Sequence, residues 1–210
     1  LGVRKGDRVA LLSNTRYEWA ATDLAILGLG GVTVPIYASS TPDDILFILT
    51  DSGARVLICE SVEAFAKIRD VAKSVKAIEH FIVFEGPAAN GHSETVSLQD
   101  LEAKGAVAMK RSPGLFEAAV DEVSATDPAT IVYTSGTTGR PRGVLHTHTQ
   151  LLSEVADAFP LLGVTPRDRS LTFLPFAHVL GRIEIYGHAL IGYTMAFAQS
   201  IERLKDDLVD

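Results

Sequence analysis

Short apolar runs, rich in β-branched residues, recur along the chain and alternate with segments of helical periodicity. They are RVALLS from Arg8, VTVPIY from Val32, RVLICE from Arg55, HFIVFE from His80, SLTFLP from Ser170 and TMAFAQ from Thr194. Near-continuous apolar runs of this length are typical of strands that are covered on both faces. The alternation therefore predicts a layered α/β fold with a largely parallel sheet flanked by helices.

Apolar residues between these runs fall at helical spacing, and polar residues mark where helices begin and end. The apolar positions are Ala20, Leu24 and Leu27 and, further on, Phe65, Ile68, Ala72 and Val75. Thr41 is the expected N-cap of a helix that has Pro42 in its first turn and ends at Gly53. Ser61 and Ser200 are the expected caps of two later helices.

The run YTSGTTGRPRG, from Tyr133 to Gly143, combines glycines, hydroxyls and fixed positive charge. Glycine lets a backbone bring its N–H groups close to an anion. Hydroxyls add donors, and guanidinium groups add charge that does not titrate near neutral pH. The composition predicts a phosphate-binding loop, with an ordinary surface turn as the alternative. The groups concerned are Thr134, Ser135, Gly136, Thr137, Thr138, Gly139, Arg140 and Arg142.

The segments on either side of this loop are both typical of strands. ATIVYT precedes it and GVLHTH follows it, so we expect the loop to join strand to strand. The Walker A loop opens a helix and contains a Gly-Lys pair, which this run lacks. A P-loop NTPase is therefore disfavoured.

Charge and cysteine content narrow the class of protein. The formal net charge is -7, and a general nucleic-acid binder needs a basic surface, so no nucleic-acid partner is expected. Cys59 is the only cysteine and lies in an apolar run, which indicates a buried thiol in a reducing, cytoplasmic setting. The longest apolar stretch, residues 24–38, is interrupted and too short to span a bilayer. We expect a chain that begins inside a longer protein, since it has neither an initiator methionine nor a signal peptide.

The glycine-rich run resembles the signature phosphate loop of the adenylate-forming, or AMP-binding, superfamily, which includes the acyl-CoA synthetases. Residues 2–60 resemble the opening of the same domain, especially in long-chain fatty-acyl-CoA synthetases. LTFLPFAHVLGR, from Leu171 to Arg182, is similar to the next motif of that branch. The usual lysine of the loop pattern is Arg142 here, which keeps the charge but changes the donor geometry.

The resemblance implies ATP-dependent activation of a long-chain fatty acid to an acyl-adenylate and then to acyl-CoA, with ATP, Mg²⁺ and coenzyme A as cofactor and co-substrates. The fatty acid is already ionised at pH 7, so its attack on phosphorus needs no general base, and no catalytic residue is assigned in this chain. Thr134, Ser135, Gly136, Thr137, Thr138, Gly139 and Arg142 are expected to bind the phosphates. Thr134 is also the expected Mg²⁺ contact.

Two residues of the second motif are expected on the acid side. His178 would lie beside the acyl pocket, following a strand. Arg182, one turn later on an expected helix, is either an anchor on the fatty-acid side or an ion partner of Glu184 or another carboxylate. A zinc site at His146 and His148, two apart on an expected strand, is disfavoured because no further ligands occur at familiar spacing.

Residues 1–210 are expected to be a partial N-terminal AMP-binding domain. The Y-G-x-T-E segment, the rest of the large domain and the C-terminal lid domain are absent, so the fragment alone is expected to be inactive. The alternatives are a fatty-acyl-AMP ligase that feeds a carrier protein and a non-catalytic nucleotide-binding module. Because the substrate would be apolar, peripheral contact with a membrane is compatible with this reading. The sequence predicts no particular oligomeric state.

Overall fold

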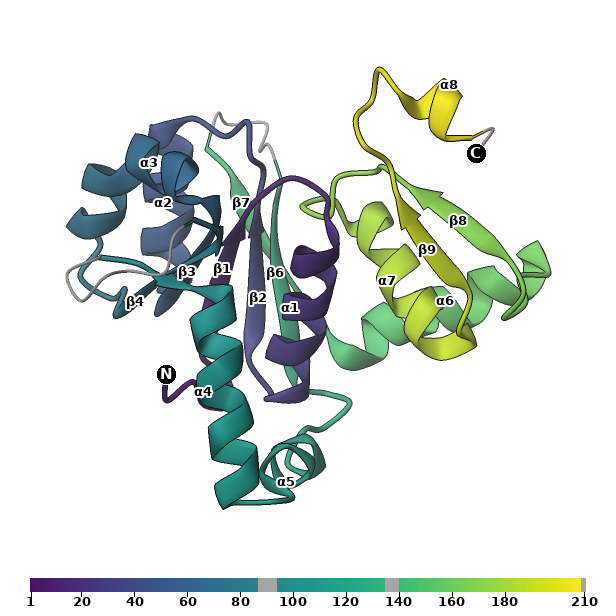
Figure 1. Ribbon diagram of the computed structural model, residues 1–210, viewed down its shortest axis with the longest axis horizontal. Helices are drawn as coiled ribbons and strands as arrows, with labels where there is room; N and C mark the ends of the chain where they lie inside the picture. The colour runs from purple at the N-terminus through teal and green to yellow at the C-terminus, as the bar shows by residue number, and fades with distance from the viewer. Residues whose placement is uncertain (87–93, 135–139, 209–210) are drawn as a thin grey trace.

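A seven-stranded sheet forms the centre of the molecule in the computed structural model, which describes residues 1–86, 94–134 and 140–208 (Figure 1). Its strand order is β5-β4-β3-β1-β2-β6-β7, and all neighbours are parallel except β6 and β7. The strands are β1 (Arg8–Leu12), β2 (Val32–Ile36), β3 (Val56–Ser61), β4 (His80–Glu85), β5 (Val96–Ser97), β6 (Pro128–Thr134) and β7 (Arg142–Thr147). The prediction of a largely parallel sheet is confirmed.

Helices cover both faces of this sheet, and the strand side chains alternate between them. Val9 and Leu11 of β1 face one apolar core, whereas Ala10 and Leu12 face the other. The first core includes α1 (Tyr17–Gly28), α6 (His148–Leu162) and α7 (Val179–Ile191), and the second includes α2 (Pro42–Ser52) and α3 (Val62–Ser74). Two-sided burial explains why the strands are apolar without interruption.

A second, two-stranded sheet lies beside the main one. β8 (Arg169–Thr172) pairs in parallel with β9 (Thr194–Phe197), and α7 is the crossover between them. The sequence predicts both strands, but not that they form a separate sheet. Figure 1 shows α6 and α7 between the two sheets, with the short α8 (Leu204–Asp207) beyond β9.

Three of the four helix-end residues that the sequence predicts are confirmed. The Thr41 hydroxyl accepts a hydrogen bond from the Asp44 amide at 3.2 Å, α2 ends at Gly53, and Ser61 caps α3. The expectation for Ser200 is wrong. Its backbone carbonyl, not its hydroxyl, accepts from the Arg203 amide, and a turn separates it from α8.

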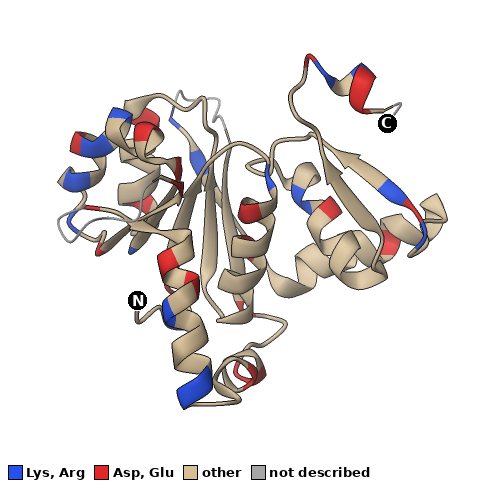
Figure 2. Ribbon diagram, in the orientation of Figure 1, with Lys and Arg blue, Asp and Glu red and all other residues tan. Residues whose placement is uncertain are grey.

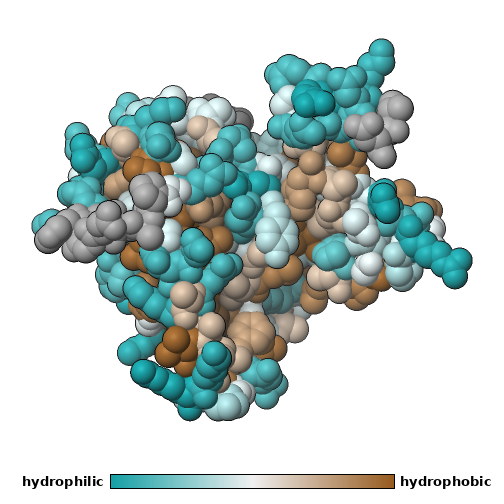
Figure 3. All heavy atoms as spheres, viewed as in Figure 1, coloured by the Kyte–Doolittle hydropathy of each residue, from teal (hydrophilic) through white to brown (hydrophobic). Residues whose placement is uncertain are grey.

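Helices α4 (Leu98–Arg111) and α5 (Leu115–Asp121) form an arm that projects from the body (Figure 1). Neither helix has a buried residue, and Val107 and Leu115 are about half exposed. Figure 3 shows apolar surface on this arm. Over the described ranges, no helix is both long and apolar enough to cross a membrane.

Candidate active site

The two strands around the glycine-rich run form a hairpin at the carboxyl edge of the main sheet. Thr134 is the last residue of β6, Arg142 is the first of β7, and the two are directly paired. The predicted strand-to-strand connection is therefore confirmed. The other predicted phosphate ligands, Ser135, Gly136, Thr137, Thr138 and Gly139, lie outside the described residues.

Alternation along β6 decides which face of the sheet Thr134 occupies. Ile131 and Tyr133 pack into the core with α2, and the Tyr133 hydroxyl donates to Asp51 at 2.6 Å. Thr130 points to the opposite face, where it contacts Arg182 of α7. Because side chains alternate with a period of two, Thr134 shares the face of Thr130. The Thr134 hydroxyl thus lies on the side of the sheet that carries α1 and α7.

The mouth of the hairpin is positively charged and tightly built. Arg140 and Arg142 are exposed, and neither makes an ion pair with another described residue. A Cβ at Gly143 would lie 2.8 Å from Ile131 Cγ2 and 3.1 Å from the Tyr133 ring. The close approach of β6 therefore requires glycine there. Two exposed guanidinium groups beside a hydroxyl suit the binding of an anion.

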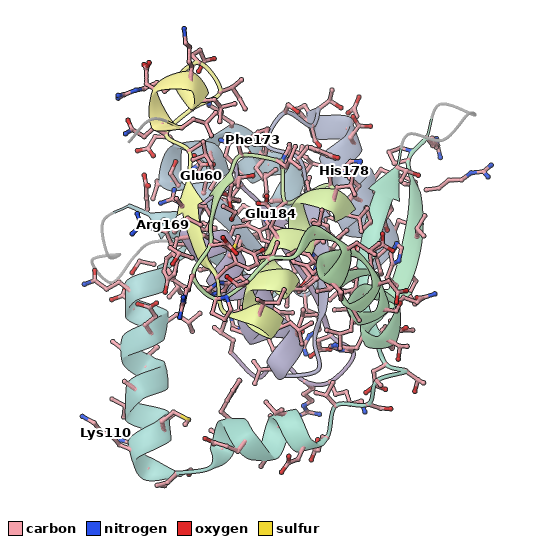
Figure 4. All side chains as sticks on the ribbon, turned by 90° about the vertical axis from the view of Figure 1, so that its right-hand side faces the viewer. Glu60, Lys110, Arg169, Phe173, His178 and Glu184 are labelled. Carbon is pink, nitrogen blue, oxygen red and sulfur yellow. The ribbon has the colours of Figure 1, made fainter. Side chains whose placement is uncertain are left out.

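His178 is the N-cap of α7, at the same edge of the molecule. The Leu180 amide donates to His178 Nδ1 at 3.2 Å, so the neutral ring carries its proton on Nε2. The imidazole is exposed, and Figure 4 shows it at the end of α7. The turn before it is fixed, because the Thr15 hydroxyl accepts from the Phe176 amide at 3.3 Å. The geometry therefore presents a hydrogen-bond donor on a rigid support.

Arg182 lies in the interior and makes an ion pair with Asp23 of α1. The side chains are 1% and 0% exposed, and the two groups meet at 2.7 Å and 3.3 Å. Burial lowers the pKa of Arg182, but the Asp23 carboxylate outweighs it, so the pKa lies above its ordinary value. Arg182 is thus the partner of a carboxylate, and that carboxylate is Asp23 rather than Glu184. Sequence reasoning missed Asp23, which resembles an ordinary polar residue of an exposed helix face.

A cavity of about 660 Å³ opens between the two sheets at the same carboxyl edge. The strands β1 and β3 are neighbours in the main sheet, but α1, which follows β1, covers one face and α3, which follows β3, covers the other. Ligands of open α/β sheets bind at such topological switch points. Glu60, which is not among the predicted site residues, lines this cavity and accepts a hydrogen bond from the Asn14 amide at 2.8 Å. Its only sequence signal is that it ends an apolar run. Figure 4 labels two lining residues, Glu60 and Phe173.

Metal-binding side chains do not gather anywhere in the described parts of the chain, where no group of three His, Cys, Asp or Glu could hold an ion. His146 lies in β7, but His148 is the first residue of α6, so the expectation that they share a strand is wrong. Burial lowers the pKa of His148. Figure 2 shows basic and acidic residues interspersed over the helices.

The doubly covered parallel sheet, with a cationic hairpin at its carboxyl edge, defines an α/β protein. The family model described as "AMP-binding enzyme" matches residues 1–210, and the chain belongs to that family. The resemblance seen in the sequence is thereby confirmed.

Several relatives are fatty-acid ligases by name. The chain is 38% identical, over 97% of its length, to the long-chain-fatty-acid–CoA ligase FadD15 of Mycobacterium bovis, and 31% identical, over 94%, to fatty acyl-CoA synthetase A of Dictyostelium discoideum. It spans about a third of the length of these relatives, 33% and 29%. An inhibitor-bound crystal structure of the N-terminal domain of FACL13 from Mycobacterium tuberculosis superimposes with a TM-score of 0.77 at 28% identity, covering 98% of this chain and 47% of that one.

Proposed function

We propose that this chain supplies the phosphate-binding part of a long-chain-fatty-acid:CoA ligase that forms an acyl-adenylate from ATP and then acyl-CoA. The observation that carries the proposal is the β6–β7 hairpin, which sets Thr134 opposite Arg142 at the carboxyl edge of the sheet. The similarity to long-chain fatty-acid ligases over nearly the whole chain supports the choice of substrate.

The proposed step is attack of a carboxylate on the α-phosphorus of ATP with departure of pyrophosphate. Both reactants are anions, so the main tasks are in-line positioning and stabilisation of negative charge. Residues Thr134, Ser135, Gly136, Thr137, Thr138, Gly139 and Arg142 hold the β- and γ-phosphates in this proposal. The exposed guanidinium of Arg142 and the hydroxyl of Thr134 support it, because both are available at the hairpin mouth.

Mg²⁺ fits this site through Thr134. The ion takes oxygen ligands, keeps several waters and binds mainly through substrate phosphates, so a single protein hydroxyl is compatible with it. When bound, it would neutralise phosphate charge. On the acid side, we assign His178 to the wall of the acyl pocket, where its Nε2–H can donate to a carboxylate or acyl oxygen.

The domain assignment is part of the same proposal. In this proposal, residues 1–210 form the N-terminal portion of the large adenylation domain. Two alternatives remain testable: a fatty-acyl-AMP ligase that delivers to a carrier protein, and a nucleotide-binding module without catalysis. The first makes acyl-adenylate but no acyl-CoA, and the second makes neither.

The test is acid-dependent exchange of pyrophosphate into ATP by the full-length protein, over acids of increasing chain length. We expect exchange that is strongest with long-chain acids, and acyl-CoA when coenzyme A is added. Replacing Thr137→Ala and Thr138→Ala together should lower exchange at least a hundredfold, because two phosphate donors are lost. The exposed Thr50→Ala on α2 serves as the matched control. Unchanged exchange in the double variant would exclude the assigned phosphate site.

A further inference from the structure

A buried polar cluster links three elements of the main sheet layer to α7. Arg182 donates to both oxygens of Asp23 and, through its third nitrogen, to Thr130 Oγ1 at 2.6 Å. Thr130 in turn donates to the Thr33 carbonyl of β2 at 2.7 Å, and Tyr186 donates to Asp23 at 3.0 Å. Four side chains make these hydrogen bonds, and each is at most 5% exposed: Asp23, Thr130, Arg182 and Tyr186. Thr33 contributes only its backbone carbonyl. The guanidinium is therefore held in one orientation.

Two residues of the cluster are each four positions along the chain from a proposed substrate contact. Thr130 is four residues before Thr134 along a strand, and Arg182 is four residues after His178 along a helix. Four residues of helix are about one turn, and a strand in the middle of a sheet is similarly stiff. The bond between Arg182 and Thr130 thus joins two rigid segments whose ends carry the phosphate-side and acid-side groups.

The stability of the fold alone does not require charged residues here. Burying two ions carries a desolvation penalty, and apolar residues of similar volume are often as stabilising. What a planar guanidinium adds is direction, because its three nitrogens fix the angle between their partners. Fully satisfied buried networks of this kind are rigid.

We infer that Asp23, Arg182 and Thr130 form a positioning cluster that sets the start of α7 relative to the end of β6. The inference rests on the proposed function, since it concerns how the acid and the phosphates of that reaction meet. None of the three residues touches substrate. They act through His178 and Thr134, because in-line attack tolerates misplacement of only about an ångström.

Thr130→Val in the full-length protein tests this inference, since valine keeps the volume and removes the hydroxyl. We expect kcat for pyrophosphate exchange to fall at least tenfold, with the KM values for ATP and acid within about twofold. Thr130→Ser, which keeps the hydroxyl, should restore most of kcat. Thr33→Val is a matched control, because Thr33 is equally buried on the adjacent strand and its hydroxyl has no hydrogen-bond partner among the described residues.

Amide hydrogen exchange without substrate gives a readout that does not depend on the proposed reaction. In Thr130→Val, amide exchange should accelerate both at the end of β6 and in the first turn of α7. The first turn includes the Leu180 amide, which donates a hydrogen bond to His178 Nδ1. In Thr33→Val neither segment should change. Unchanged exchange in α7, or an unchanged kcat in an active enzyme, would overturn the inference. Absence of pyrophosphate exchange in the unmodified protein would instead refute the proposed function. Amide hydrogen exchange would still show whether Thr130 couples the end of β6 to the start of α7.

Discussion

The single cysteine shows how burial controls the chemistry of one side chain. Cys59 lies in β3, is 0% exposed, and packs in the core against α2 and α3. Burial raises the pKa of its thiol to about 12, compared with an ordinary value of about 8.5. At pH 8, roughly one thiol in 10⁴ is then ionised, and only the thiolate is an effective nucleophile.

We therefore expect Cys59 to resist alkylation by iodoacetamide at pH 8 in the folded protein. The same residue should react fully in urea, where burial is lost. Mass spectrometry of the peptide that contains Cys59 follows this residue directly. Alkylation at equal rates with and without urea would contradict the buried position.

The roles of some residues could be predicted because their partners are close in the sequence, whereas the roles of others depend on partners far along the chain. Thr41 and Ser61 could be assigned from sequence, because a cap bonds a backbone amide three residues away. Asp23 could not, because its role depends on Arg182, 159 residues further along the chain. Only the folded chain brings such a pair together.

At the scale of elements, α7 and the turn before it are packed without space between them. A Cβ at Gly181 would lie 2.4 Å from the Pro175 carbonyl oxygen, a contact that cannot exist. The turn that leads into His178 therefore rests directly on the backbone of α7. Glycine at position 181 allows this close contact and so helps to determine the position of His178.

Gly181→Ala should displace this turn, and with it His178. We expect the KM for the fatty acid to rise at least tenfold in pyrophosphate exchange, with the KM for ATP little changed. Gly105→Ala is the matched control, because Gly105 is also helical but has nothing within 4 Å of an added Cβ. This control should keep its activity and gain about 0.5–1 kcal/mol in helix stability. An unaltered KM in Gly181→Ala would show that the turn does not position the acid.

Elements were easier to predict than their partners. The apolar runs at β8 and β9 indicate strands, yet nothing in either run states that they pair with each other instead of joining the main sheet. The arm of α4 and α5 was not predicted, and neither helix has a buried residue in the structure.

For the whole molecule, the ion pair of Asp23 and Arg182 connects α1, on the main sheet, with α7, which joins the strands of the small sheet. Asp23→Asn should destabilise this region by about 3–5 kcal/mol, because it leaves a buried guanidinium without its counter-charge. Native-state amide exchange of α1 and α7 in the full-length protein measures the loss.

A surface ion pair provides the comparison. Glu79 pairs with Arg55 at 2.6 Å, but its side chain is 50% exposed, so Glu79→Gln should leave amide exchange nearly unchanged. If both variants had equally small effects, the interior pair would not hold the two parts of the molecule together.

The overall architecture could be predicted because alternating strands and helices leave few ways to cover a sheet on both faces. The glycine-rich run could be placed between two strands because the segments on either side of it are both typical of strands. Glu60 and the cavity beside it could not be predicted from the residues alone, since they depend on how the small sheet lies against the main one.

The antiparallel strand β7 is the outermost of the main sheet in the described part of the chain. Its free side offers a row of backbone donors and acceptors, and Val144 and Leu145 are 43% and 51% exposed along it. Such a border is a template for another strand. Residues 1–210 by themselves are therefore expected to self-associate through this border.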